Sequence, residues 1–193
     1  MQPDALIISG DSKVGVVLRE RLEATGRSVV ATTRRLPYAA GMLPFDLRYD
    51  SWLPIPEVAY FATGITGFKP CEVDPEETHR INAVLQVRAA KRLKEAGCKK
   101  LVFLSSAAAE MRPDTIYGIS KINAEREFVR LGGVCYRTGP IAFPWKHVYP
   151  NEVYSPINLS TLSDLLLSVF DTWQPGIHSI YNRTWVKEEE PSL

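Results

Sequence analysis

Three residues between positions 101 and 121 have side chains and a spacing suited to proton transfer. Tyr117 and Lys121 are four residues apart, so a helix here places the phenol and the ammonium on one face. An apolar run, Leu101–Leu104, precedes two hydroxyls, Ser105 and Ser106. A nearby cation favours the phenolate and lowers a tyrosine pKa from its ordinary value of about 10. The trio therefore suits general acid–base chemistry at an alcohol or carbonyl oxygen, which a serine hydroxyl would hold.

The start of the chain predicts a nucleotide-binding turn. Ala5–Ser9 is an apolar run typical of a strand buried on both faces. The segment Gly10–Gly15 follows, and Val16–Ala24 has helical periodicity. Gly10 allows the backbone to approach a phosphate, while the helix start offers N–H groups and the positive end of a dipole. Ser12 and Lys13 can add hydrogen bonds and charge.

Two arginines follow the second predicted strand, Ser28–Thr32. In a βαβ unit this is where the ribose of a dinucleotide is recognised. An acid there favours the free hydroxyl of NAD, and arginine favours the 2′-phosphate of NADP. Arg34 and Arg35 therefore indicate NADP, with NAD as the alternative. A solvated basic turn is the other interpretation of this pair.

Alternating strands and helices predict an α/β fold with a parallel sheet covered on both faces. Ligands of such sheets bind beyond the carboxyl ends of the strands. Asn82 lies inside the long predicted helix, where a polar residue usually faces solvent. Asp74 is expected to cap that helix, with Pro75 at its first position. The further elements expected are a strand at Val58–Ala62 ending in Thr63 and Gly64, a helix at Asp74–Gly97, a strand at Leu101–Leu104, a helix at Thr115–Leu131 and a strand at Val134–Arg137.

The last third is less regular. Phe143–Pro156 contains several prolines and aromatics and is interpreted as a substrate loop without regular structure. Ser160–Trp173 predicts an amphipathic helix that Ser160 caps, and Ile177–Tyr181 predicts a final strand. Lys187–Leu193, with three glutamates in a row, is expected to be a solvated end.

Bulk properties predict one cytoplasmic domain. A chain of 193 residues with a formal net charge of +1 gives no reason to expect nucleic acid as a partner. No apolar stretch approaches the roughly 20 residues of a membrane span, and no signal peptide is recognisable. Cys71, Cys98 and Cys135 lack the spacing of a disulfide framework or a metal site, so we expect reduced thiols and no metal.

With these motifs the chain resembles the short-chain dehydrogenase/reductase superfamily, in its extended branch of nucleotide-sugar epimerases, dehydratases and ketoreductases. The resemblance covers nearly the whole chain. The matching segments are ALIISG with VG at the glycine turn, FDL, FATG, INAVLQVRAAKRLKEAG, LVFLSS, YGISK, RTGPIAFP, and LSDLLLSVFD followed by IYN. It implies a Rossmann-type, doubly wound parallel sheet over residues 1–193, with 143–193 forming a reduced C-terminal substrate lobe.

The resemblance also implies roles for particular residues. Ser106, Tyr117 and Lys121 correspond to the catalytic set, with Ser105 next to the expected serine. Lys121 would lower the pKa of Tyr117 and hold the nicotinamide ribose. The cofactor would contact Gly10, Ser12, Lys13, Val14, Arg34, Arg35, Asp46, Leu47, Ala62, Thr63, Gly64, Tyr117 and Lys121. The family has three glycines spaced three apart; here the middle one is missing, and the turn is interpreted as one residue shorter.

The expected activity is an NAD(P)-dependent oxidoreductase that reduces a keto group on a sugar or nucleotide-sugar. Dehydratases of the family carry an acid directly after the catalytic hydroxyl, whereas Ala107–Ala109 follow Ser106 here. An epimerase with tightly bound NAD is the second interpretation. A dinucleotide-binding regulator without turnover is the third, because the glycine turn is altered and the substrate lobe is small. The two long helices would also allow a homodimer, as is common in the family.

Overall fold

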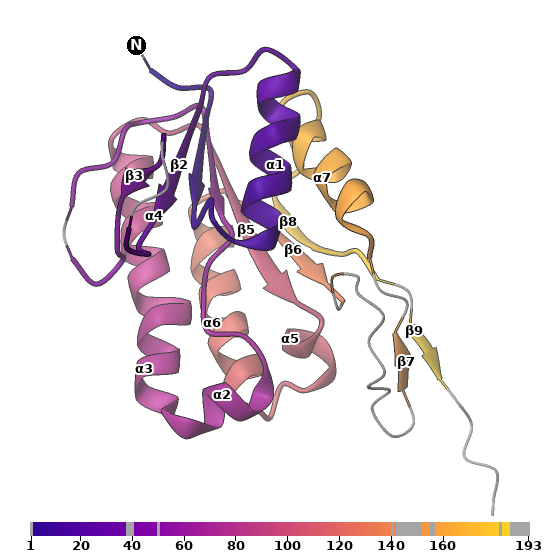
Figure 1. Cartoon of the computed structure of the whole chain (residues 1–193). Helices are drawn as coiled ribbons and strands as arrows, with labels where there is room; N and C mark the ends of the chain where they lie inside the picture. Colours follow the sequence, from indigo (N-terminus) through magenta and orange to yellow (C-terminus); the bar gives the residue numbers. More distant parts are fainter. Residues whose placement is uncertain are drawn as a thin grey trace, which may run out of the picture.

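A seven-stranded parallel sheet forms the centre of the computed structural model (Figure 1). The structure describes residues 2–37, 41–49, 51–139, 141, 152–154, 157–181 and 183–185, with backbone only for 152–154 and 183–185. The strands lie in the order β3-β2-β1-β4-β5-β6-β8. From β1 the chain runs outward through β2 and β3, then crosses back to β4 on the other side. The order therefore reverses between β1 and β4, which confirms the Rossmann-type α/β prediction.

Most of the predicted elements are present, with most ends shifted by one or two residues. The first helix begins three residues earlier than predicted, and the last one ends at Ser168, five residues earlier than predicted. The strands are β1 (Ala5–Ile8), β2 (Val29–Thr33), β3 (Leu43–Pro44), β4 (Val58–Phe61), β5 (Lys100–Ser106), β6 (Val134–Thr138), β7 (Glu152–Tyr154), β8 (Gly176–Ser179) and β9 (Arg183–Trp185). The helices are α1 (Lys13–Ala24), α2 (Phe68–Val73), α3 (Pro75–His79), the π-helical turn η1 (Arg80–Leu85), α4 (Gln86–Glu95), α5 (Ala108–Met111), α6 (Ile116–Arg130) and α7 (Leu159–Ser168).

Helices cover both faces of the sheet, as the buried strands require. On one face α1 packs beside α7, and Leu18, Leu22, Leu162 and Leu166 are fully buried in the same cluster (Figure 1). The other face is covered by α4 and α6. There the ring of Phe128 stacks on Phe103 of β5 at 4.7 Å between centroids. Burying two faces of one sheet fixes the register of its strands, and with it the edge where they end.

The helix expected at 74–97 forms as α3, η1 and α4 in succession. Asp74 caps its start as predicted, because its carboxylate accepts a hydrogen bond from the Glu77 N–H at 3.0 Å. The unexpected feature is the π-helical turn, which contains Asn82. The expectation that Asn82 faces solvent is wrong, since its side chain is completely buried. Turns of this kind often occur at functional sites.

Three expectations for the last third need correction. The cap of α7 is Asn158 rather than Ser160, because its Oδ1 accepts from the backbone N–H groups of Ser160 and Thr161. The strand predicted at Ile177–Tyr181 is β8, and it is not the last, since β9 follows. β9 pairs antiparallel with β7, which lies in the segment expected to be irregular. The remaining residues of that segment, and Lys187–Leu193, lie outside the described part of the chain.

The cysteines and the acidic residues form no metal site in the described ranges. Cys71, Cys98 and Cys135 are buried and carry no disulfide, in agreement with the prediction of thiols. Within the same ranges no group of three or more His, Cys, Asp and Glu side chains is arranged to hold a metal ion. No helix among the described residues is long and apolar enough to cross a membrane.

Candidate active site

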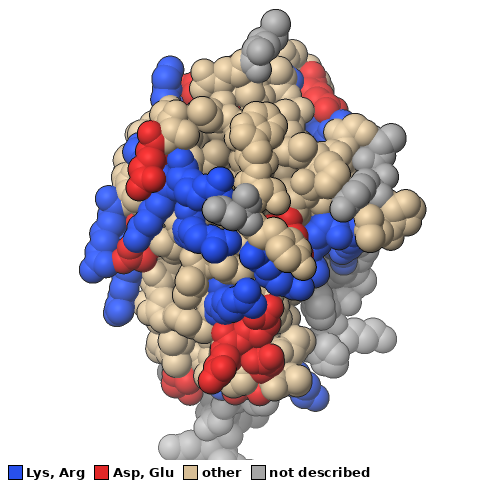
Figure 2. All heavy atoms as spheres, turned by 90° about the vertical axis from the view of Figure 1, so that its left-hand side faces the viewer, with Lys and Arg blue, Asp and Glu red and all other residues tan. Residues whose placement is uncertain are grey.

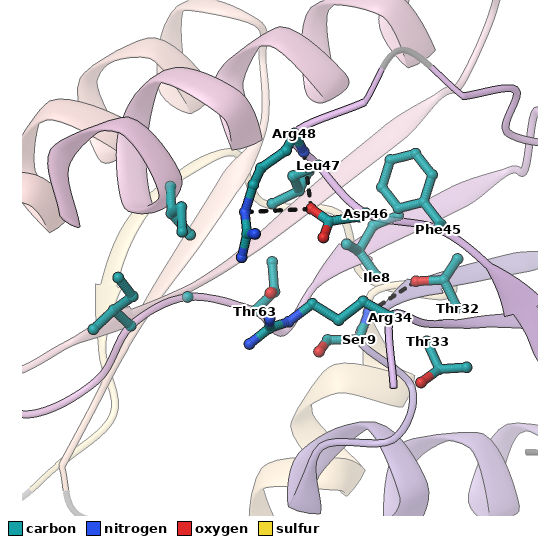
Figure 3. Close-up of a pocket in the computed structure, with 13 residues that line it drawn as sticks. Ile8, Ser9, Thr32, Thr33, Arg34, Phe45, Asp46, Leu47, Arg48 and Thr63 are labelled. Atoms are coloured by element: carbon teal, nitrogen blue, oxygen red, sulfur yellow. Dashed lines mark hydrogen bonds and ion pairs between the residues drawn. The ribbon is translucent and has the colours of Figure 1, made fainter. Parts of the chain in front are cut away.

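A cleft opens at the carboxyl edge of the sheet, where β1, β2 and β4 end (Figure 3). Its volume is about 500 Å³, counting the open mouth. It lies at the reversal of strand order, the place where sheets of this type bind ligands. The cleft is lined by Ile8, Ser9, Thr32, Thr33, Arg34, Phe45, Asp46, Leu47, Arg48, Thr63, Gly64, Ile65 and Ile81.

In the turn between β1 and α1 two glycines are tightly packed, and a serine has a left-handed backbone conformation. Ser9 has φ of +69°, a conformation that glycine adopts most easily. A Cβ at Gly10 would lie 2.5 Å from the Cβ of Ala31, and one at Gly15 would lie 2.5 Å from the carbonyl oxygen of Ser9. Gly10 and Gly15 therefore have no room for a larger side chain without movement of their neighbours. The shortened glycine turn stays a prediction.

The residues at the start of α1 differ in what they offer a phosphate. The Ser12 hydroxyl accepts a hydrogen bond from the Gly15 N–H at 3.1 Å and so caps the helix. Lys13 is exposed at the first helical position. The side chain of Val14 is only 8% exposed and packs in the core, so only its backbone faces the turn. Gly10 packs against Ala31 of β2 and does not line the cleft.

The two arginines after β2 have different surroundings. Arg34 lines the cleft, over which its side chain extends (Figure 3). Arg35 is not among the lining residues; its Nε lies 3.1 Å from Oδ2 of Asp11, and its side chain is 75% exposed. The same Asp11 oxygen accepts a hydrogen bond from the Thr33 hydroxyl at 2.9 Å. The sequence has no acidic residue directly after the second strand, but the turn after the first strand brings Asp11 to the end of β2.

The loop after β3 forms the far wall of the cleft. Asp46 and Leu47 line it, as the resemblance implied, and Phe45, Arg48 and Ile81 line it as well. Arg48 donates its backbone N–H to the Asp46 carboxylate at 3.0 Å, and its Nε is 3.8 Å from the same oxygen (Figure 3). Arg48 could not be predicted from the sequence, because its position depends on where a short edge strand ends.

Asn82 fixes the loop that follows β4. Its Oδ1 accepts the Ile65 N–H at 2.7 Å, and its Nδ2 donates to the Ile65 carbonyl at 2.8 Å. Nδ2 also lies 3.2 Å from the Ser120 hydroxyl on α6. Thr63 and Gly64 of this loop line the cleft. Ala62 is not among the lining residues, and its backbone N–H donates to the Ile8 carbonyl at 3.2 Å. Asn82 therefore connects the cleft to the helix that carries Tyr117.

The two serines at the end of β5 point to opposite sides, as successive strand residues do. The Ser105 hydroxyl turns inward and donates to Glu125 at 2.5 Å. Ser106 is half-buried at the strand end, and its Oγ accepts the Ala108 N–H at 3.2 Å. Only Ser106 thus has its hydroxyl at the mouth of the strand. Tyr117, in the first turn of α6, is half-buried with its ring edge-to-face against Phe68 at 6.0 Å.

Lys121 is buried beneath the tyrosine. Its Nζ lies 5.9 Å from the centroid of the Tyr117 ring and donates to the Leu104 carbonyl at 3.0 Å. Burial lowers the pKa of Lys121 to about 8, and the negative charge of Glu125 partly opposes that shift. The proximity to the tyrosine ring matches the expectation. The hydrogen bond to Leu104 shows that the ammonium is also tied to the end of β5.

A buried ion pair that sequence analysis missed lies behind the trio. Glu125 is 1% exposed, and Arg137 on β6 binds it through Nε at 2.9 Å and Nη2 at 2.7 Å. Arg137 also reaches Glu110 at 3.2 Å. The hydrogen bonds to Glu125, and to a lesser degree that to Glu110, raise the pKa of the Arg137 guanidinium. Two features of the sequence could have indicated this ion pair: a glutamate four residues after Lys121 and an arginine inside an apolar strand.

The comparisons with known proteins show the family of the chain. Residues 6–133 match the model of the NAD dependent epimerase/dehydratase family. The chain belongs to this family, and its fold is the Rossmann-type α/β fold of its structural neighbours. No curated protein matches the sequence.

Several solved structures share the fold at low sequence identity. MoeE5, in complex with UDP-glucose and NAD, is 19% identical with a TM-score of 0.79, covering 96% of this chain and 79% of that one. A hypothetical dTDP-4-dehydrorhamnose reductase from Sulfolobus tokodaii is 21% identical with a TM-score of 0.76, covering 96% and 78%. The UDP-glucose 4-epimerase of Thermotoga maritima, with UDP-glucose, is 14% identical with a TM-score of 0.77, covering 94% and 78%.

Proposed function

We propose that this protein is an NADPH-dependent reductase of a keto group on a sugar or nucleotide-sugar, with Tyr117 as the general acid. The observation that carries the proposal is the placement of Lys121. A buried ammonium 5.9 Å from the Tyr117 ring is costly to maintain, since burial disfavours the charged form. It stabilises the phenolate that remains after Tyr117 gives up its proton. The half-buried Ser106, on the neighbouring strand end, is the donor for the substrate oxygen.

In this mechanism each residue has one task. The Ser106 hydroxyl donates a hydrogen bond to the substrate carbonyl oxygen and so orients it. Tyr117 transfers its phenolic proton to that oxygen as negative charge develops there. Lys121 favours the resulting phenolate by its charge, and Glu125 helps to keep Lys121 protonated. The chemistry that NADPH would supply when bound beside these residues is hydride transfer to the carbonyl carbon.

The cleft fits the adenosine half of a dinucleotide. Leu47 and Ile81 provide apolar surface for a base, and Arg34 provides a cation at the end of β2. The turn at Gly10–Gly15 and the start of α1 offer backbone N–H groups to phosphates. Arg34 is the residue we assign to the 2′-phosphate of NADPH. Ser12 and Lys13 would lie at the pyrophosphate.

One observation favours the second candidate, an epimerase that retains NAD. Asp11 lies beside Arg35 and Thr33 at the end of β2, and a carboxylate at this place suits a ribose with a free hydroxyl. Family membership and the solved structures are compatible with either activity. A regulator that binds a dinucleotide without turnover is the third candidate.

The test combines binding and turnover. Nicotinamide fluorescence titrations with NADPH and NADH would be followed by NADPH oxidation on a panel of keto-sugars, free and nucleotide-linked. We expect Tyr117→Phe to lower turnover by about a hundredfold or more with little change in NADPH affinity. Tyr49→Phe, which alters an exposed hydroxyl, is the matched control. Unchanged turnover in Tyr117→Phe would refute the mechanism. NAD retained through purification would favour the epimerase, and binding without any turnover would favour the regulator.

A further inference from the structure

The chain between Ser106 and Tyr117 folds back tightly against α6. It contains the short helix α5 and a turn at Arg112, whose carbonyl oxygen accepts a hydrogen bond from the Thr115 hydroxyl at 2.8 Å. The turn approaches α6 closely because residue 118 is glycine, and a Cβ there would collide with the same carbonyl oxygen. Gly118 directly follows Tyr117. The turn therefore holds Arg112 close to the residue that we assign as the general acid.

Helix α2 brings an aromatic ring to the same place. Both α2 and α5 pack against α6, at the end of the molecule toward which the strands point (Figure 1). Glu72 fixes α2 there, because its Oε1 accepts the Ile116 N–H at 3.3 Å. Phe68, the first residue of α2, is half-buried, and its ring centroid lies 6.0 Å from that of Tyr117. The ring of Phe68 therefore forms a wall beside the general acid.

The guanidinium of Arg112 lies over the Phe68 ring. Its Cζ is 5.3 Å from the ring centroid, within the range of a cation–π interaction. The Nε of Arg112 is 3.8 Å from Oδ1 of Asp114, which is too far for a hydrogen bond, and the two side chains are 46% and 76% exposed. An ion pair of this kind contributes little to stability. The ring therefore orients the guanidinium, and its N–H groups remain accessible from solvent.

Charge recognition at this place depends on Arg112 rather than on a broadly basic surface. Figure 2 shows carboxylates gathered at the lower end of the face that it presents. This is the end of the molecule at which α3 begins, with Asp74, Glu76 and Glu77. Lys69 on α2 is exposed as well, but its ammonium is a point charge, whereas the planar guanidinium of Arg112 offers paired donors to an oxyanion.

We propose that Arg112 and Phe68 form a subsite for an acidic group, a phosphate or a carboxylate, carried by the sugar that is reduced. The inference rests on the proposed function, because Tyr117 marks the position of the carbonyl. Neither Arg112 nor Phe68 lines the cofactor cleft. The apolar face of the sugar packs on Phe68, and its acidic group accepts two parallel hydrogen bonds from the guanidinium. Neutral sugars lack this pair, so the protein selects acidic keto-sugars.

The experiment measures binding without turnover, so its result does not depend on the protein being a reductase. Saturation-transfer NMR on the full chain, with and without NADPH, follows glucose 6-phosphate, glucuronate and glucose. We expect at least one of the two acidic sugars to bind about tenfold more tightly than glucose, and which one binds distinguishes phosphate from carboxylate. Arg112→Met should remove the preference and leave the affinity for glucose unchanged. Arg112→Lys should restore part of it, because the charge returns without the paired donors.

Arg27→Met is the matched control. Arg27 is also stacked on a phenylalanine, with its Cζ 3.6 Å from the Phe170 centroid, but it precedes β2 and so lies at the opposite edge of the sheet. Its removal changes the net charge equally and should leave all three affinities unchanged. The melting temperature of each Arg112 variant should match that of the parent, because the side chain is exposed.

The possible outcomes separate the subsite from the activity. Equal binding of acidic and neutral sugars by the parent would overturn the subsite. A preference that persists in Arg112→Met, or that Arg27→Met removes as well, would overturn it too. Acidic sugars that bind through Arg112 without reduction of any keto-sugar would support the subsite and count against the reductase.

Discussion

Replacing Glu125 by glutamine tests whether the buried ion pair positions Lys121, the lysine of the proposed mechanism. The substitution keeps the shape of the side chain and removes its charge. Arg137 would lose the carboxylate that it binds at 2.7 and 2.9 Å and keep its contact with Glu110 at 3.2 Å. Breaking a buried pair costs about 3–5 kcal/mol. Because Arg137 keeps Glu110 as a partner, we expect the free energy of unfolding to fall by about 3 kcal/mol, near the lower end of that range. The melting temperature should then be lower by roughly 6–12 °C.

The same substitution should move the pH dependence of turnover. The charge of Glu125 raises the pKa of Lys121, which burial brings down to about 8. Without that charge the pKa falls further, so Lys121 loses its proton at lower pH. At a pKa of about 8, roughly three quarters of the lysine is protonated at pH 7.5; one unit lower, only about a quarter is. Turnover that needs protonated Lys121 should therefore decline at lower pH in the variant.

The assay is NADPH oxidation between about pH 6 and pH 9, a range that brackets the loss of the Lys121 proton. Thermal unfolding is measured on the same samples. Glu127→Gln is the matched control, since Glu127 lies on the same helix and pairs with Lys91 and Arg130 at a less buried position. It should change stability by less than about 1 kcal/mol and leave the pH profile unchanged. A Glu125→Gln profile that coincides with the parent would refute the positioning role.

Two further predictions concern charge. Lys121→Met should abolish turnover yet raise the free energy of unfolding at pH 7 by about 2 kcal/mol. This figure is the relief of the burial cost after subtraction of the lost hydrogen bond to Leu104. Burial lowers the Lys121 pKa from 10.5 to about 8. The free-energy cost of burying the charged lysine is therefore full below pH 8 and disappears towards pH 10.5. If denaturant melts showed the same stability difference between variant and parent at pH 7 and at pH 10, they would contradict this. Asp11→Asn removes the carboxylate 3.1 Å from Arg35, so the affinity for NADPH relative to NADH should rise between about two- and fivefold. Fluorescence titrations with both cofactors measure that ratio, and an unchanged value would exclude Asp11 from cofactor discrimination.

The sequence by itself determined the fold class and the proximity of Tyr117 to Lys121. Apolar runs such as Ala5–Ile8 must be buried on both faces, and intervening helical periodicity then requires a parallel sheet with its ligand edge at the strand ends. Tyr117 and Lys121 were placed together by a spacing of one helical turn. The sheet and the proximity of Tyr117 to Lys121 were predictable because they depend on residues close together in the chain.

Only the tertiary structure decided which partners each side chain meets. The hydroxyl of Ser105 turns inward because Glu125, twenty residues away, accepts its hydrogen bond. Asn82 is buried because a loop 17 residues earlier brings Ile65 back against it. Asp11 joins Arg35 because β1 and β2 end side by side. Each contact joins residues that lie in different segments of the fold, and local periodicity carries no information about where the chain brings two such side chains together.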